Sequence, residues 1–139
     1  MFELFDDKAV IAVELAQQEA RRLGLRHVSS ELLLVGLVAR EDNLAASILQ
    51  GLQLTLPRVR AEVEKEAELV FEKGIGPVPL EIPFTAEVKQ SLEQAVFEAR
   101  QLGQSIGPEH LLLALMRNPE TGADFRGLNP QVARDLRCT

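Results

Sequence analysis

Apolar residues recur at helical spacing near the start of the chain. Steps of four and three separate the alanine, valine and leucine residues at Ala9, Val13, Ala16, Ala20 and Leu23. This spacing is typical of a helix that buries one face. Asp6 precedes the pattern and is a natural N-cap, because its carboxylate can accept hydrogen bonds from the free amides of the first turn. Gly24 follows the pattern and predicts a left-handed C-cap.

The next predicted helix is apolar on nearly every side. After a cap at Ser29 or Ser30, residues 31–38 read ELLLVGLV. A helix without a polar face sits in the middle of a bundle, because every side of it needs cover. Gly36 interrupts the run, and we expect it to mark a contact where a side chain would hold two helix backbones apart.

Two more helices are expected before residue 73. A short third helix contains Leu44, Ala45, Ile48 and Leu49 and ends at Gly51. A fourth helix, capped by Thr55, runs from about Leu56 to Glu72. Its inward positions are Val59, Val63, Ala67 and Val70. Its acidic face, made of Glu62, Glu64, Glu66 and Glu68, is most simply solvated surface, with cation binding as the alternative.

The first two helices have a second copy later in the chain. Residues 16–24 (AQQEARRLG) match residues 95–103 (AVFEARQLG), and residues 28–37 (VSSELLLVGL) match residues 106–115 (IGPEHLLLAL). The offset is 79 residues up to the glycine and 78 after it. An internal repeat of this size is typical of a duplicated structural unit.

The second copy predicts four further helices. Thr85 caps the fifth, which Gly103 ends and whose inward residues are Val88, Leu92, Ala95, Ala99 and Leu102. Pro108 opens the sixth helix at a position that favours proline. A short seventh helix follows, and Asn129-Pro130 opens an eighth, with Val132, Ala133 and Leu136 inward.

These elements predict an all-α fold of two pseudo-twofold-related four-helix repeats, about eight helices in one compact domain. Repeat 1 covers about residues 1–72 and repeat 2 about residues 85–139. Between them, residues 73–84 contain two glycines and three prolines and cannot continue a helix. We expect an extended connector whose apolar residues lie in the groove between the repeats.

Composition limits the classes of partner. The net charge is −6, which argues against nucleic acid and anionic membranes, since both select for clustered lysine and arginine. Cys138 is the only cysteine, so a disulfide framework is impossible, which suits a reducing cytosol. No signal peptide or stretch of membrane-spanning length is visible. We therefore expect a cytoplasmic protein whose acidic surface is compatible with recruiting cationic groups.

The sequence contains no convincing catalytic constellation. A phosphate-cradling glycine loop is missing, and neither His27 nor His110 has a metal-binding context. We expect no catalytic residue, no cofactor and no metal. What remains is a symmetric pair, Glu31 and Glu109, each in the first turn of the most hydrophobic helix of its repeat. They either complement the helix dipole or present an acceptor to a guanidinium or ammonium group of a partner, at a shallow groove in each repeat.

At these residues the chain resembles the Clp N-terminal (Clp repeat) domain. The family pattern is Ala-Gln-x-Glu-Ala-Arg-x-Leu-Gly, then Gly-Thr-Glu-His before a leucine-rich helix, and it occurs twice. This chain matches at residues 16–24 and 95–103, then at Ser29-Ser30-Glu31-Leu32 and Gly107-Pro108-Glu109-His110. The similarity covers nearly the whole chain and is nearest to ClpC; stand-alone ClpT-type proteins share the domain.

The resemblance implies a helical module that binds adaptors or substrates for an unfoldase and its protease. In ClpC-type domains the glutamates bind the guanidinium of phosphoarginine, and a threonine helps to hold the phosphate. Glu31 and Glu109 match the glutamates, and Thr85 matches the threonine of the second site. At the first site Asp6 stands where threonine is usual. The resemblance therefore predicts that Thr85 belongs to the site of Glu109.

The resemblance favours a non-catalytic recruitment module of the Clp AAA+ chaperone–protease system. Its partners would be Clp ATPase or protease subunits, adaptors, and unfolded or tagged substrates, in the cytoplasm or, for a plant-type homologue, the plastid stroma. The alternative is a stand-alone accessory subunit that stabilises the Clp protease core without binding substrates. An enzyme of unknown type and a purely structural helical domain are the remaining alternatives.

Overall fold

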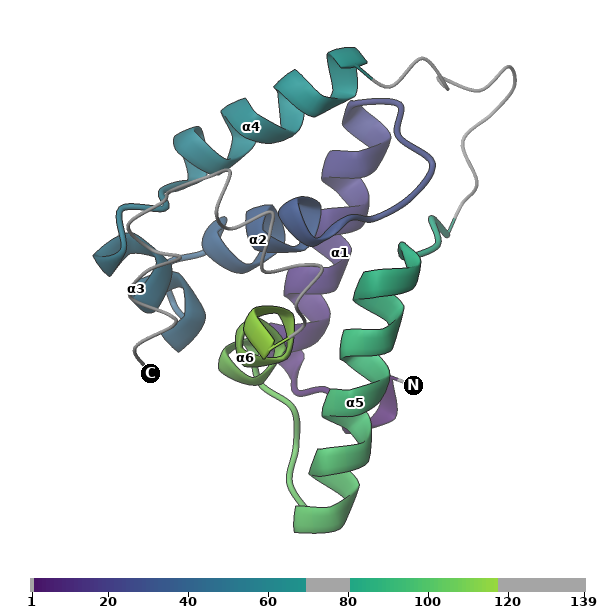
Figure 1. Cartoon of the computed structure of the whole chain (residues 1–139). Coiled ribbons are helices and arrows are strands. Elements are labelled where there is room, and N and C mark those ends of the chain that lie inside the picture. Colours follow the sequence, from purple (N-terminus) through teal and green to yellow (C-terminus); the bar gives the residue numbers. More distant parts are fainter. Residues whose placement is uncertain (1, 70–80, 118–139) are drawn as a thin grey trace.

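The computed structural model describes residues 2–69 and 81–117, and its regular elements are all helical (Figure 1). In chain order they are the 3-10 turn η1 (Phe2–Leu4) and the helices α1 (Asp7–Arg22), α2 (Ser30–Val38), α3 (Leu44–Gly51), α4 (Leu56–Leu69), α5 (Ala86–Leu102) and α6 (Pro108–Arg117). The predicted inward residue Val70, most of the connector, and the predicted seventh and eighth helices lie outside the described residues. The six helices confirm the all-α prediction.

Side-chain caps start the helices where the sequence predicts them. The Asp6 carboxylate accepts a hydrogen bond from the Ala9 amide at 2.8 Å, and the Thr85 hydroxyl accepts one from the Val88 amide at 3.4 Å. Of the two serines, Ser29 is the cap of α2, since its hydroxyl accepts from the Leu32 amide. Each cap satisfies an amide that has no partner within its own helix.

The leucine-rich helix α2 is the centre of the fold. Every residue of α2 is buried, and the helix packs against α1, α3, α4 and α6. The polar faces of α1 and α5 are exposed, whereas α2 has none to expose. The predicted central helix is thus confirmed.

Gly36 lets α1 and α2 approach closely. A Cβ atom built on Gly36 would overlap the carbonyl oxygen of Ala12 and lie 3.1 Å from the amide nitrogen of Ala16. Both atoms belong to the backbone of α1 and cannot rotate away. The predicted close contact at Gly36 is therefore present.

Short extended segments tie the two repeats together reciprocally. Residues around Phe5 pair with Ile106, through hydrogen bonds from the Asp6 amide to the Ile106 carbonyl (2.9 Å) and from the Ile106 amide to the Leu4 carbonyl (2.7 Å). The equivalent residues, which lie 79 or 78 positions away in the sequence, form a second pair of hydrogen bonds. The Thr85 amide donates to the Val28 carbonyl at 3.0 Å, and the Val28 amide donates to the Pro83 carbonyl at 2.8 Å. In each repeat, the segment before the first helix thus pairs with the other repeat, as pseudo-twofold symmetry requires.

A buried carboxylate joins α1 to α4. Glu19 is 4% exposed and forms ion pairs with Arg22 of its own helix and with Arg60 of α4, the second at 2.9 Å. Arg22 also reaches Glu64 of α4 at 2.9 Å. The pKa of Arg22 is raised mainly by the hydrogen bond that its guanidinium donates to Glu64, and also by the one that it donates to Glu19. These contacts hold α4 across repeat 1.

One predicted core residue lies on the surface. Leu102 follows the inward spacing of α5, yet its side chain is 69% exposed, so this prediction is wrong. Leu102 is the last residue of α5, and in the described part of the chain nothing covers it, whereas Val88, Leu92, Ala95 and Ala99 are buried as predicted. Helical spacing predicts which way a side chain points, but it does not predict whether another element packs against that side chain.

The end of the connector is fastened to α1 by Gln17. The Gln17 side chain donates to the Ile82 carbonyl at 3.0 Å and accepts from the Ile82 amide at 2.9 Å. Ile82 is buried, as expected for an apolar connector residue in the groove between the repeats.

Gln17→Glu is expected to destabilise the fold by about 1–2 kcal/mol, because a carboxylate cannot donate to the Ile82 carbonyl and leaves it unpaired. Chemical denaturation measures the free energy of unfolding. The exposed neighbour Gln18→Glu adds the same charge and serves as the control. Equal stability of the two variants would contradict the role of Gln17.

Candidate functional site

Glu109 lies in a surface groove that both repeats line. The groove is lined by the N-cap and first turn of α1 (Asp6, Lys8), by the turn before α3 and its first turn (Glu41, Asp42, Asn43, Leu44, Ser47), and by the start of α6 (Pro108, Glu109). Four of these side chains are carboxylates and one is an ammonium. Lys8 donates to the backbone carbonyl of Asp42, so its charge lies at one side of the groove.

The first turn of α6 holds the Glu109 side chain in an open position. Glu109 is 36% exposed, and its carboxylate folds over Gly107, where a Cβ atom would lie 2.6 Å from Oε1. His110 Nδ1 accepts a hydrogen bond from the Gly107 amide at 2.9 Å, which is the backbone-capping role that glutamate or glutamine fills in a capping box. Because His110 caps the amide, the Glu109 carboxylate is not needed for it.

Glu31 occupies the matching position in repeat 1 but is buried. It is 5% exposed, and the Ser30 hydroxyl donates to its carboxylate at 3.2 Å. Of the two glutamates, Glu109 thus lies at a groove, whereas Glu31 is not exposed at one as expected. The helix starts differ as well: Ser30 stands beside Glu31 and donates to it, whereas Pro108 precedes Glu109 and offers no side-chain donor.

Thr85 lies beside the segment that leads to Glu31, not the one that leads to Glu109. The Thr85 amide donates to Val28, three residues before Glu31, whereas Asp6 pairs with Ile106, three residues before Glu109. Our assignment of Thr85 to the site of Glu109 is thus wrong. The reciprocal pairing of the repeats places the threonine with Glu31 and the aspartate with Glu109.

The Glu109 groove is suited to cationic groups. Asp6, Glu41, Asp42 and Glu109 would attract a guanidinium or ammonium group and repel a phosphate. Helix α6 begins at the groove, and its dipole would favour an anion there, but the effect is worth less than about 1 kcal/mol at an exposed helix end. The four carboxylates therefore dominate the choice of ligand.

Within the described residues, no three side chains of histidine, cysteine, aspartate or glutamate lie together as metal ligands would. His27 is an exposed link residue, while His110 is used as a cap. Of the helices described, none combines the length and the apolar character needed to span a membrane.

The sequence alone missed Asp6, Glu41, Asp42 and Lys8 as neighbours of Glu109. The sequence identified Asp6 as a cap of α1, which it is, and the resemblance placed it at the site of Glu31 in place of the usual threonine. Its second location, beside α6, depends on the pairing of Phe5 with Ile106. A signal for this location was that Phe5 and Phe84 occupy the same position in the two repeats. In a duplicated fold, two such segments can each pair with the other repeat instead of with their own.

Comparisons with known proteins agree with this architecture. The family model of the Clp repeat (R) N-terminal domain matches residues 4–126. Chaperone protein ClpC1, chloroplastic, of Oryza sativa is 43% identical over 96% of this chain, and a ClpA homolog of Porphyra purpurea, an ATP-binding subunit of the ATP-dependent Clp protease, is 46% identical over 86%. The chain spans 15% and 14% of the length of these two relatives.

A solved structure has the same fold. The N-terminal domain of the chaperone ClpD from Arabidopsis thaliana aligns with a TM-score of 0.68 at 24% identity, covering 98% of this chain and 93% of that one. The duplicated motif, the reciprocal helical repeats and the family match over residues 4–126 agree, and the chain belongs to the Clp repeat N-terminal domain family.

Proposed function

We propose that this chain is a non-catalytic recruitment module of the Clp chaperone–protease system, which binds adaptors or substrates for ATP-dependent proteolysis. Membership of the family and similarity to the ClpC and ClpA N-terminal regions support the general role. The acidic groove at Glu109, open and lined by both repeats, is the observation that carries the specific role. The protein would work where Clp ATPases do, in the cytoplasm or, as in the relatives named chloroplastic, in plastids.

The proposed ligand of the Glu109 groove is an arginine side chain of a partner. A guanidinium would pair with the Glu109 carboxylate, and Asp6, Glu41 and Asp42 would add attraction at longer range. Phosphorylation of that arginine would weaken binding here, because the phosphate would face the same carboxylates. Glu31 and Thr85 form the counterpart site, where the threonine hydroxyl suits a phosphate but the buried carboxylate limits access.

Titration of the ¹⁵N-labelled full chain with an arginine-containing peptide, and with the same peptide carrying phosphoarginine, tests this assignment. We expect the unmodified peptide to shift the Gly107 and Glu109 amide resonances. Glu109→Gln should weaken its affinity about 10- to 100-fold, since a hydrogen bond between charged groups contributes about 1.5–3 kcal/mol. Glu31→Gln should leave the affinity for this peptide nearly unchanged.

Glu93→Gln is the matched control, because Glu93 is an exposed acid on α5 outside the groove. It removes the same charge and should not change the affinity. Equal losses for Glu31→Gln and Glu109→Gln would reject the asymmetry between the two sites. Failure of both peptides to shift any resonance would reject the assignment of the groove to arginine.

A further inference from the structure

One phenylalanine of the described residues is largely exposed on α5. The side chain of Phe97 is 59% exposed, whereas the ring of Phe2 packs against those of Phe5 and Phe84. The counterpart of Phe97 in repeat 1 is Gln18, since the two positions are 79 residues apart. Burial of an aromatic ring is strongly favourable. Phe97 therefore gives the surface of α5 an apolar centre that the matching surface of α1 lacks.

Charged side chains flank Phe97 on the same face of α5. The face follows the spacing i, i+3, i+4 and i+7, which places side chains on one side of a helix. Its members line one shallow hollow and form the Phe97 face: Glu93, Val96, Phe97, Arg100 and Gln101. In the described part of the chain, neither Glu93 nor Arg100 takes part in an ion pair, and both are exposed. Their charges therefore point to a contact outside the described residues.

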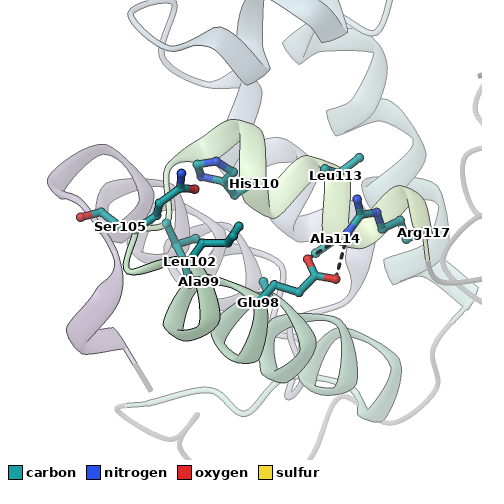
Figure 2. A pocket seen from close by; sticks show the side chains of 11 residues that line it. Glu98, Ala99, Leu102, Ser105, His110, Leu113, Ala114 and Arg117 are labelled. Atoms are coloured by element: carbon teal, nitrogen blue, oxygen red, sulfur yellow. Dashed lines mark hydrogen bonds and ion pairs between the residues drawn. The ribbon is translucent and has the colours of Figure 1, made fainter.

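The side of α5 that faces α6 is used within the domain. Figure 2 shows the carboxylate of Glu98 on α5 bound by the guanidinium of Arg117 on α6, at 2.9 Å. Of the described helices, α6 packs most extensively against α5, and Figure 1 shows α5 along the edge of the domain. Phe97 and Glu93 lie about 100° and 140° around the helix from Glu98. The Phe97 face is thus on a different side of α5 from the contact with α6.

The charges around Phe97 are arranged so that the face is complementary to a copy of itself. Glu93 precedes Phe97 by four residues and Arg100 follows it by three, which corresponds to about 6 and 4.5 Å along the helix axis. When two antiparallel copies of α5 meet at a twofold axis near Phe97, Glu93 of one copy lies within about 1.5 Å of Arg100 of the other along that axis. The twofold axis forms this pair twice. Opposite charges therefore meet on both sides of an apolar centre.

We propose that this chain self-associates through the Phe97 face, as an antiparallel pair of α5 helices. Phe97 of each copy packs against Phe97 and Val96 of the other, and the two Glu93–Arg100 ion pairs lie on either side. A single helix face buries less than the roughly 1,200 Å² of a stable interface, so the association is weak. The face lies outside the Glu109 groove, so the proposal is independent of the ligand of that groove. At low protein concentration the Glu93 variants therefore remain valid controls for ligand binding.

The matching face of α1 provides a control within the same chain. At its two charged positions α1 has the same residue types, Glu14 and Arg21. At the two central positions it has glutamines, and one of them, Gln17, is bound to Ile82 of the connector. The face of α1 thus has the charges of the Phe97 face without its apolar centre, and we expect it not to self-associate.

Sedimentation velocity of the full chain between about 20 µM and 1 mM tests the proposal, since a small interface gives weak affinity. We expect the average sedimentation coefficient to rise with concentration. Phe97→Gln, which gives α5 the residue type found in α1, should weaken the association at least about tenfold, because it removes the apolar centre. Glu93→Arg should weaken it as strongly, because two arginines then face each other. Glu14→Arg makes the same charge change on exposed α1 surface and should leave the association unchanged.

A charge exchange between two chains identifies the face. Glu93→Arg and Arg100→Glu should each abolish self-association, because each creates two pairs of like charge. An equimolar mixture of these two variants should associate as the unmodified chain does, since the mixed pair again joins arginine to glutamate twice. A variant that merely disturbs folding cannot give this rescue. A mixture that stays monomeric would overturn the proposal, as would an unmodified chain that stays monomeric at about 1 mM or a Phe97→Gln chain that associates equally well.

Discussion

Gly36→Ala is expected to destabilise the protein by about 3 kcal/mol, as overpacking of a tight interior contact does. The added Cβ would overlap the Ala12 carbonyl oxygen in the backbone of α1. A side chain at the position of this carbonyl could change its rotamer, but the backbone of a helix can move only together with the rest of the helix. Helices α1 and α2 would have to separate, and the packing of the central helix would loosen. Chemical denaturation, followed by far-ultraviolet circular dichroism, measures the loss.

Gly51→Ala is the matched control for this substitution. Gly51 is the last residue of α3, and a Cβ atom there would meet nothing within 4 Å. Alanine favours helix over glycine by about 1 kcal/mol at most, so stability should stay unchanged or rise. A Gly36→Ala protein as stable as the Gly51→Ala protein would show that the two helices do not approach as described.

Leu34→Ala should cost about 2–5 kcal/mol of unfolding free energy, the range for leucine truncations that leave a cavity. Leu34 is fully buried in the middle of α2 and has no path to solvent. The helices around α2 hold it on several sides, so the cavity cannot collapse by the movement of one neighbour. The same denaturation experiment measures the cost.

Leu44→Ala makes the same chemical change on the surface. Leu44 is 58% exposed at the start of α3, so its truncation should change stability by less than about 0.5 kcal/mol. A similar small effect for Leu34→Ala would mean that α2 is not the central helix of the protein.

Much of the fold could be predicted because its signals are local. Asp6, Ser29 and Thr85 are caps whose partners lie three residues away, and spacing of apolar residues identified the buried faces of α1, α4 and α5. The duplicated motif then identified the symmetry, because two similar segments fold in similar ways. Gly36 could be interpreted because a glycine in an otherwise apolar helix usually has a packing reason.

The errors concern contacts between segments far apart in the sequence. Leu102 follows the helical pattern but lies where none of the described residues covers it. Thr85 was assigned to Glu109 because both belong to repeat 2, whereas the repeats exchange their pairing segments. Glu31 and Glu109 share a position in the repeat, yet Glu31 is buried and Glu109 is partly exposed, because burial depends on which elements pack over each helix start.

Affinity capture with the full chain as bait tests most directly whether this domain recruits Clp partners through the Glu109 groove. Three baits are compared by quantitative mass spectrometry of proteins captured from a lysate of the source cells: the unmodified chain, Glu109→Lys, and Glu93→Lys as the control that adds the same charge on α5. The account predicts that Clp ATPase or protease subunits, their adaptors or their substrates are captured by the unmodified chain and by Glu93→Lys and are strongly depleted with Glu109→Lys. Capture of the protease core by all three baits in equal amounts would contradict the account and favour a structural accessory subunit.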